Sequence, residues 1–167
     1  SRFAGHRVAI RIGIAAGEVV AGAVGAAGRL NYTVHGDTVN LAARLESIQK
    51  LYGTNIMVNG LINEHIQDQV ETRWVDQIQV VGKEEAVAVY EIIDRKGDVS
   101  TRMSEVLGSW NDGMAAYKDY QFTSAQKHFE AALRAEPSDG PTKLYVERCK
   151  VFSLDPPEDL IYRATSK

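Results

Sequence analysis

Cysteine is nearly absent from this sequence: among 167 residues, only Cys149 carries a thiol. One thiol cannot form a disulfide within the chain, and it cannot supply the several thiolates of a zinc cluster. Disulfide-stabilised secreted proteins are therefore excluded, and the expected setting is the cytoplasm. If a longer parent protein carries a membrane anchor, the expected setting is the cytoplasmic face of that membrane.

Long apolar runs and excess positive charge are lacking as well. The most apolar stretch, residues 19–28, is shorter than the roughly 20 residues of a membrane-spanning helix. No leader-like apolar core follows residues 1–6, so no signal peptide is expected. Lysine and arginine number 19 against 22 acidic residues, and the resulting net charge of −3 does not attract a polyanion. Nucleic acid is not expected as a partner.

Phosphate-loop and metal-ligand patterns are missing too. Neither a GxGxxG motif nor a Walker lysine accompanies the glycines of residues 22–25. No metal ligand is assigned within the chain. The histidines show no ligand spacing, and we expect surface or packing roles for all of them: His6, His35, His65 and His128.

What is present is an ordinary globular composition, with 44% hydrophobic and 25% charged residues. Apolar periodicity separates predicted strands from predicted helices in the first part of the chain. The strands cover residues 8–14, 18–24, 30–34, 55–58, 71–81 and 86–93, with a flexible connection at 25–28 and a hairpin turn at 82–85. The helices cover residues 37–51 and 61–69. This alternation favours an α/β or α+β sheet domain.

From about residue 97 the pattern changes to helices alone, the last of them over residues 141–152. One such helical unit cannot bury its apolar face alone, so we expect it to dock on the sheet domain, on a protein partner or on its own copy. A packing appendage without a ligand is the favoured interpretation. Small, aromatic and helix-ending residues fall at the positions of a tetratricopeptide repeat, whose period is about 34 residues: Gly113, Ala125, Phe129, Ala132 and Pro137.

The helix over residues 37–51 carries two side chains suited to an anion. Asp37 is a good N-cap residue, and Gly53 is a plausible C-cap residue. Asn40 and Arg44, spaced i and i+4, lie on one helical face. Arginine keeps its charge and presents a fork of donors to phosphate oxygens, while asparagine donates or accepts beside it. The alternative is a solvated helix edge. An apolar stripe runs beside the pair: Leu41, Leu45 and Ile48.

Four sequence blocks lie in and around this helix: RIGI at 11–14, GEVVAG at 17–22, VG at 24–25 and GDTVNLAARLES at 36–47. In this order and spacing they resemble the second half of a class III nucleotidyl cyclase catalytic domain, over roughly residues 7–93. The resemblance implies an α+β fold with a ferredoxin-like βαββαβ sheet, of which this chain would hold part. It divides the chain into a partial cyclase domain at 1–96 and an all-helical appendage at 97–167.

The resemblance also implies a reaction and residue roles. Family members convert ATP to cyclic AMP and pyrophosphate between two subunits, with two metal ions, Mg or Mn, held by two aspartates. By position, Asn40 looks like the residue that orients the ribose, and Arg44 like the one that steadies charge on the reacting phosphate. Thr33 occupies the place that reads the purine edge, with its neighbour Val34 also in the substrate-binding strand. A threonine hydroxyl accepts from adenine or donates to guanine, so ATP is favoured and GTP stays open.

Two features depart from the family pattern. The metal-binding aspartates, and the lysine that helps to read the base, would lie upstream of Ser1. This chain alone is therefore expected to be inactive. Where many relatives carry a lysine that contacts the triphosphate, the chain has Val81, and Lys83 lies two residues further on. Loss of that lysine would weaken phosphate binding without abolishing the fold.

Three hypotheses follow. In the first, the chain is the C-terminal part of an adenylate cyclase domain for intracellular signalling, which binds ATP as a homodimer and supplies the base-reading and transition-state side of the site. In the second, it is a catalytically degenerate cyclase-like module that regulates by binding a nucleotide or a partner. In the third, the helical tail is a protein-docking module. Two aspartates in the parent's upstream sequence would favour the enzyme.

Overall fold

The computed structural model describes residues 9–26, 28–79 and 85–163. Its strands are β1 (Ile12–Ile14), β2 (Val20–Ala26), β3 (Arg29–His35), β4 (Ile56–Asn59), β5 (Val70–Gln79), β6 (Val87–Arg95) and β7 (Tyr162–Arg163). Its helices are α1 (Asp37–Tyr52), α2 (Gly60–Ile66), α3 (Thr101–Lys118), α4 (Phe122–Ala135) and α5 (Gly140–Phe152). None of the helices in these ranges combines the length and apolarity needed to cross a bilayer.

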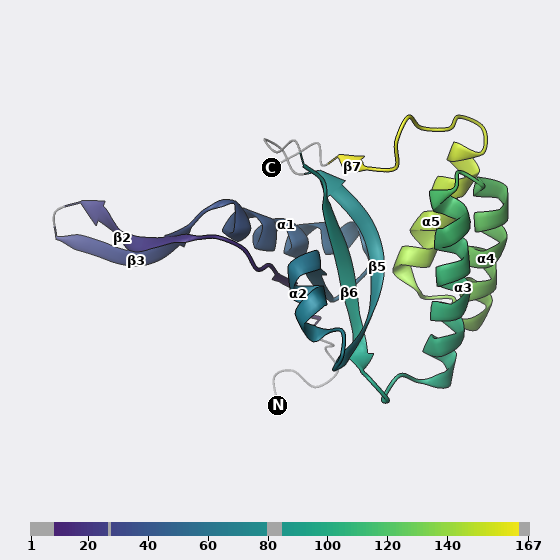
Figure 1. The fold of residues 1–167 in the computed structure, drawn as a ribbon, viewed down its shortest axis with the longest axis horizontal. Coiled ribbons are helices and arrows are strands. Elements are labelled where there is room, and N and C mark those ends of the chain that lie inside the picture. Colours follow the sequence, from purple (N-terminus) through teal and green to yellow (C-terminus); the bar gives the residue numbers. More distant parts are fainter. Residues whose placement is uncertain (1–8, 27, 80–84, 164–167) are drawn as a thin grey trace, which may run out of the picture.

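The strands form a five-stranded sheet in the order β1–β4–β6–β5–β7 and a separate antiparallel hairpin of β2 and β3. Within the sheet, β1 pairs parallel with β4 and β7 parallel with β5, whereas β6 is antiparallel to both of its neighbours. The predicted α+β class is confirmed. Figure 1 shows the hairpin projecting from the body, with α1 and α2 on one side of β5 and β6 and α3 to α5 on the other.

The N-cap of helix α1 lies one residue earlier than predicted. Gly36 is the N-cap residue, and Asp37 is the first helical residue, so the prediction of Asp37 as N-cap is wrong. Gly36 has a φ of 139°, which favours glycine over aspartate at that place. An acidic residue in the first turn still suits the positive end of the helix dipole. At the other end, Gly53 adopts the left-handed conformation and donates its N–H to Gln49, as a C-cap glycine does.

The predicted apolar stripe of α1 faces the core. Leu45 and Ile48 are buried, and Leu41 packs against them from a half-buried position. Strand β1 lies directly beneath the helix, because a Cβ placed on Gly13 would come within 2.2 Å of the Ala42 carbonyl oxygen. Only glycine permits this approach, so Gly13 sets the distance between β1 and α1.

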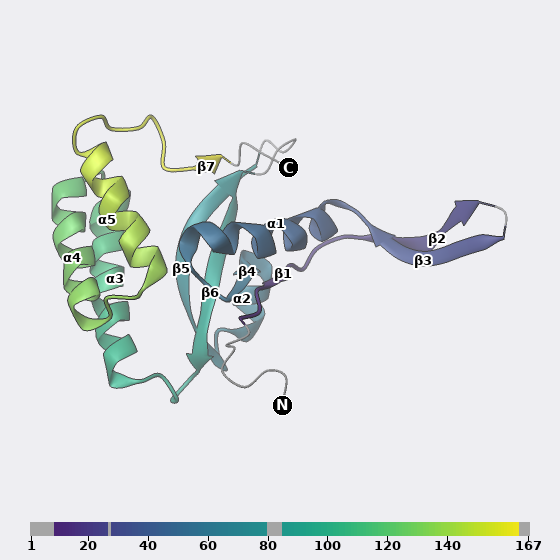
Figure 2. The same ribbon diagram turned by 180° about the vertical axis from the view of Figure 1, so that it is seen from behind.

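The three tail helices dock on the sheet, which is the first of the three predicted alternatives. Trp110 donates its Nε1–H to the Trp74 carbonyl, and Tyr145 donates its hydroxyl to the Val75 carbonyl. Most aromatic residues of the tail lie in one buried cluster together with residues of α1, β4, β5 and β6. Sheet and tail therefore share one hydrophobic core. Figure 2 shows the tail from behind as a layer distant from the hairpin.

The packing roles predicted inside the tail are also visible. A Cβ on Gly113 would lie 2.6 Å from the Phe129 ring, so α3 and α4 meet at closest approach there. Ala125 and Ala132 are fully buried, and α4 ends two residues before Pro137. Small side chains thus bring the two helices together, as the spacing predicted.

Several predicted boundaries need correction. The strand predicted over 8–14 is confined to Ile12–Ile14 within the described residues, and β2 extends to Ala26, into the predicted connection. Helix α2 ends at Ile66 rather than at residue 69, and a turn leads from it to β5, which begins at Val70. The appendage is not all-helical, since its last described residues form β7 and add a strand to the sheet. His6, Val81, Lys83 and most of the predicted turn at 82–85 lie outside the described residues.

Candidate active site

Helix α1 presents the predicted pair of anion-binding side chains. Asn40 lies in its first turn and is exposed, and Arg44 lies one turn further on and is half-buried. Residues i and i+4 are neighbours on a helical surface, so both side chains can reach one ligand. Since α1 is anchored on β1 through Gly13, the pair is carried by a fixed element rather than by a loop.

The hairpin holds the two residues assigned to substrate binding. Thr33 is half-buried and Val34 is exposed, and as consecutive strand residues they point to opposite faces of β3. Thr33 pairs with Gly22 across the hairpin. A Cβ on Gly22 would meet no atom of the described residues within 4 Å, so the surface beside the Thr33 hydroxyl is open. On the face of β3 that carries Thr33, a ligand can contact the Thr33 side chain, whereas Val34 can offer only its backbone there.

An open hollow of about 660 Å³ lies where the hairpin meets α1. It is lined by residues 18–20 before and in β2 and by residues 36–38 at the start of α1. The Thr38 hydroxyl donates to the Glu18 carbonyl oxygen at 2.8 Å and ties the two segments together. None of the four predicted site residues lines this hollow, so they stand beside it on β3 and further along α1.

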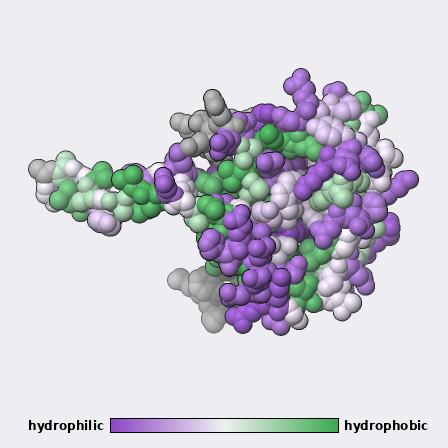
Figure 3. Space-filling view, in the orientation of Figure 1, coloured by the Kyte–Doolittle hydropathy of each residue, from purple (hydrophilic) through white to green (hydrophobic). Residues whose placement is uncertain are grey.

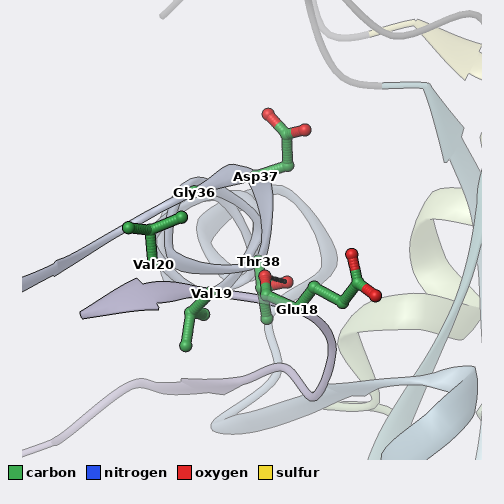
Figure 4. Close-up of a pocket in the computed structure, with 6 residues that line it drawn as sticks. All are labelled: Glu18, Val19, Val20, Gly36, Asp37 and Thr38. Atoms are coloured by element: carbon green, nitrogen blue, oxygen red, sulfur yellow. Dashed lines mark hydrogen bonds between the residues drawn. The ribbon is translucent and has the colours of Figure 1, made fainter.

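The acidic residues near the hollow do not form a metal site. Figure 4 shows the carboxylates of Glu18 and Asp37 pointing in different directions. Across residues 9–26, 28–79 and 85–163, no group of three or more His, Cys, Asp or Glu side chains is placed to hold a metal ion. The donor sets in the described part of the chain therefore do not fit the two-metal centre that the resemblance implies.

The structure also shows a buried polar cluster that the sequence analysis missed. Tyr52, the last residue of α1, donates its hydroxyl to Asp76 Oδ2 at 2.5 Å, and Arg148 Nη1 of α5 donates to the same oxygen at 2.6 Å. Asp76 is fully buried. The sequence carried no clear signal for this cluster, because Asp76 stands among other polar residues of β5, such as Arg73 and Gln77. Only the burial of Asp76 shows that its carboxylate needs a partner. The identity of that partner, far away in the sequence, was not readable.

The surroundings of Tyr52 and Arg148 shift the pKa of both side chains upward. Burial raises the pKa of the Tyr52 phenol, and the Asp76 carboxylate raises that pKa further. Burial alone would lower the pKa of Arg148, but Asp76 and the surrounding tyrosines outweigh it and raise the pKa. Tyr52 is therefore a neutral donor and Arg148 a cation at any working pH.

A family match and individual relatives agree on the kind of protein that the chain resembles. The family described as adenylate and guanylate cyclase catalytic domain matches residues 2–93. The terminal-differentiation-specific adenylate cyclase of Dictyostelium discoideum is 35% identical over 153 residues, which are 89% of this chain and 7% of that protein. Adenylate cyclase 1 of Rhizobium meliloti is 41% identical over 83 residues, half of this chain and 12% of its own length.

A solved structure, that of the adenylyl cyclase CyaB from P. aeruginosa, aligns over 59% of this chain and 50% of its own, with 33% identity and a TM-score of 0.49. The chain spans only 7% to 22% of the length of the named adenylate cyclases among its curated relatives.

Proposed function

The chain belongs to the family of adenylate and guanylate cyclase catalytic domains, and from this membership we propose that it supplies one side of an adenylate cyclase site within a longer parent protein. The reaction is the conversion of ATP to cyclic AMP and pyrophosphate. The observation that carries the proposal is the pairing of Asn40 and Arg44 on one face of α1, inside the matched family region.

In this proposal each residue has a physical role. Arg44 donates from its guanidinium to oxygens of the reacting phosphate and stabilises the charge that develops there. Asn40 holds the ribose so that its 3′-oxygen faces that phosphate. Thr33 accepts from the adenine amino group on the open face beside Gly22, which favours ATP over GTP. Val34 contributes backbone contact on the same strand.

A second subunit and ions complete the site. The hairpin exposes large apolar side chains, among them Val20, Leu30 and Tyr32, and Figure 3 shows apolar surface along this projection. Such a surface suits coverage by a second copy, so we propose a homodimer. The divalent ion, Mg or Mn, would neutralise phosphate charge when bound. Its ligands would come from the parent protein outside this chain.

The proposal is tested by measuring cyclic AMP formation by the parent protein with ATP and either Mg²⁺ or Mn²⁺. Arg44→Ala and Asn40→Ala should each lower kcat by about 10²-fold or more, because each removes an interaction made to the transition state. Lys50→Ala, an exposed change in the last turn of the same helix, is the matched control and should leave kcat unchanged. Full activity of both site variants would contradict the assigned roles.

Val81, which stands where many relatives carry a lysine that contacts the triphosphate, favours a second candidate, a catalytically degenerate module that regulates by binding a nucleotide or a partner. Here ATP would bind the parent without turnover, and its upstream sequence would lack the two aspartates. Cyclic AMP formation by the parent would eliminate this candidate.

For residues 97–167 we propose a mainly helical extension of a partial ferredoxin-like cyclase domain at 1–96, with one tetratricopeptide-like pair in α3 and α4 and with its last strand, β7, in the sheet. Most of its aromatic rings lie in the core shared with the sheet, which supports a packing role over capture of a protein partner. We place the whole protein in the cytoplasm or at the cytoplasmic face of a membrane.

A further inference from the structure

The C-terminal end of α1 is held by the tail through a hydrogen-bonded triad. Tyr52 is fully buried, and its hydroxyl meets Asp76 of β5. Arg148 of α5 donates to that carboxylate and also, through Nη2, to the Tyr52 oxygen at 3.3 Å. One side chain of the tail therefore contacts both members of the pair that anchors α1 to the sheet.

Backbone contact reinforces the side-chain contact. A Cβ on Gly140, the first residue of α5, would lie 2.3 Å from the Tyr52 carbonyl oxygen and 2.8 Å from the Gly53 Cα. The start of α5 thus abuts the C-cap of α1. That start is itself fixed, because Arg73 of β5 donates two hydrogen bonds to Asp139, the N-cap residue of α5.

Aromatic rings enclose the cation of this triad. The Arg148 guanidinium lies over the rings of Tyr52, Tyr145 and Tyr162, at 5.7, 4.9 and 5.6 Å from their centroids. The Tyr162 ring, contributed by β7, also meets the Tyr52 ring edge-on at 6.4 Å. These contacts restrict the side chains of the triad to one arrangement.

We propose that Tyr52, Asp76 and Arg148 are positioning residues, which fix the placement of α1 and so aim Asn40 and Arg44 at the nucleotide. This inference rests on the proposed function. Arg44 and Tyr52 are eight residues apart, about 12 Å along a rigid helix, so a displacement at Tyr52 moves Arg44 with it. Misplacing a reacting group by about 1 Å can cost about 10²-fold in rate. The tail then contributes to turnover by holding α1 in place.

The chain offers a matched pair of variants that separates positioning from stability. Tyr52→Phe and Tyr145→Phe each delete one buried hydroxyl at the interface between tail and sheet. Tyr145 donates to the Val75 carbonyl at 2.7 Å and so joins α5 to β5, whereas the Tyr52 hydroxyl holds α1. Both variants keep their rings in the core. In the parent protein, cyclic AMP formation should therefore respond to Tyr52→Phe and not to Tyr145→Phe.

The expected result is a fall in kcat of about tenfold or more for Tyr52→Phe, with KM within about twofold, because orientation and not binding is disturbed. Tyr145→Phe should stay within about twofold of wild type. In an Arg44→Ala background, Tyr52→Phe should cause no further loss, since it acts through Arg44. Arg148→Met should resemble Tyr52→Phe, and Arg148→Lys should recover part of the activity.

Equal losses for the two phenylalanine variants, or losses that multiply with Arg44→Ala, would overturn the positioning role. If the wild-type parent makes no cyclic AMP, or Arg44→Ala is fully active, the proposed function is wrong, whatever the role of Tyr52. Amide hydrogen exchange of this chain then decides whether Tyr52 holds α1 in place. Tyr52→Phe, but not Tyr145→Phe, should accelerate exchange in residues 41–47 of α1, and identical exchange in both variants would refute it.

Discussion

The projecting hairpin and the helical tail place their large apolar residues in opposite environments. On the hairpin, Tyr32 is 79% exposed and Leu30 is 70% exposed. In the tail, Trp110 and Tyr145 are at most 1% exposed. Most of the large apolar side chains of the tail pack in the core that it shares with the sheet, whereas those of the hairpin are available to another molecule. Helix α1 joins the two regions, since its first turn follows the hairpin and its last residue contacts α5.

Arg73→Ala should produce the largest loss of stability, and it tests the buried contacts between the tail and the sheet. Arg73 bonds Glu91 at 2.6 Å and Asp139 at 2.7 Å, and both carboxylates lie in the interface. Removing the cation leaves both carboxylates without a counter-charge, at a cost of about 3–5 kcal/mol in the free energy of unfolding. Denaturant titration measures this loss. Lys150→Ala breaks an exposed pair of the same length, Lys150 to Glu147 at 2.6 Å, and should have almost no effect.

Gly113→Ala should have the next largest effect. The added methyl group would lie 2.6 Å from the Phe129 ring, and separating α3 from α4 should cost about 1–3 kcal/mol. A methyl group added to Gly108, on the same helix, would meet no atom of the described residues within 4 Å, so Gly108→Ala should stabilise the chain by up to about 1 kcal/mol. Thermal unfolding of both variants compares them directly. A neutral Gly113→Ala would mean that the two helices can separate freely.

Leu30→Ser should have the smallest effect on stability, and it tests whether the exposed hairpin is covered by a second copy. Because Leu30 is mostly exposed, the free energy of unfolding of the chain should change by less than about 0.5 kcal/mol. Self-association of the parent, measured by sedimentation, should weaken if a second copy covers the hairpin. A large loss of chain stability would show instead that this residue serves the core.

Local features of the chain were predictable, because their causes are local. The spacing of Leu41, Leu45 and Ile48 predicted the buried face of α1, and Gly53 marked its end. The same spacing argument put Asn40 and Arg44 on one face of the helix. Their roles and those of Thr33 and Val34 remain predictions.

Contacts between distant segments were not predictable. Arg73 meets Asp139, 66 residues away, and Tyr52 meets Arg148, 96 residues away. Nothing in the spacing of either pair marks a partner, because the tertiary fold alone brings them together. Strand β7 was missed for a related reason: its two residues carry no periodicity, and pairing with β5 defines it. The Asp37 error arose because Gly36 and Asp37 are both acceptable cap residues in sequence.

The most direct test of the account is a crystal structure of the parent protein with a non-hydrolysable ATP analogue. The account predicts that the Arg44 guanidinium lies within about 3.2 Å of a phosphate oxygen, and that the Asn40 amide contacts the ribose. A structure in which both side chains point away from the bound nucleotide would contradict it.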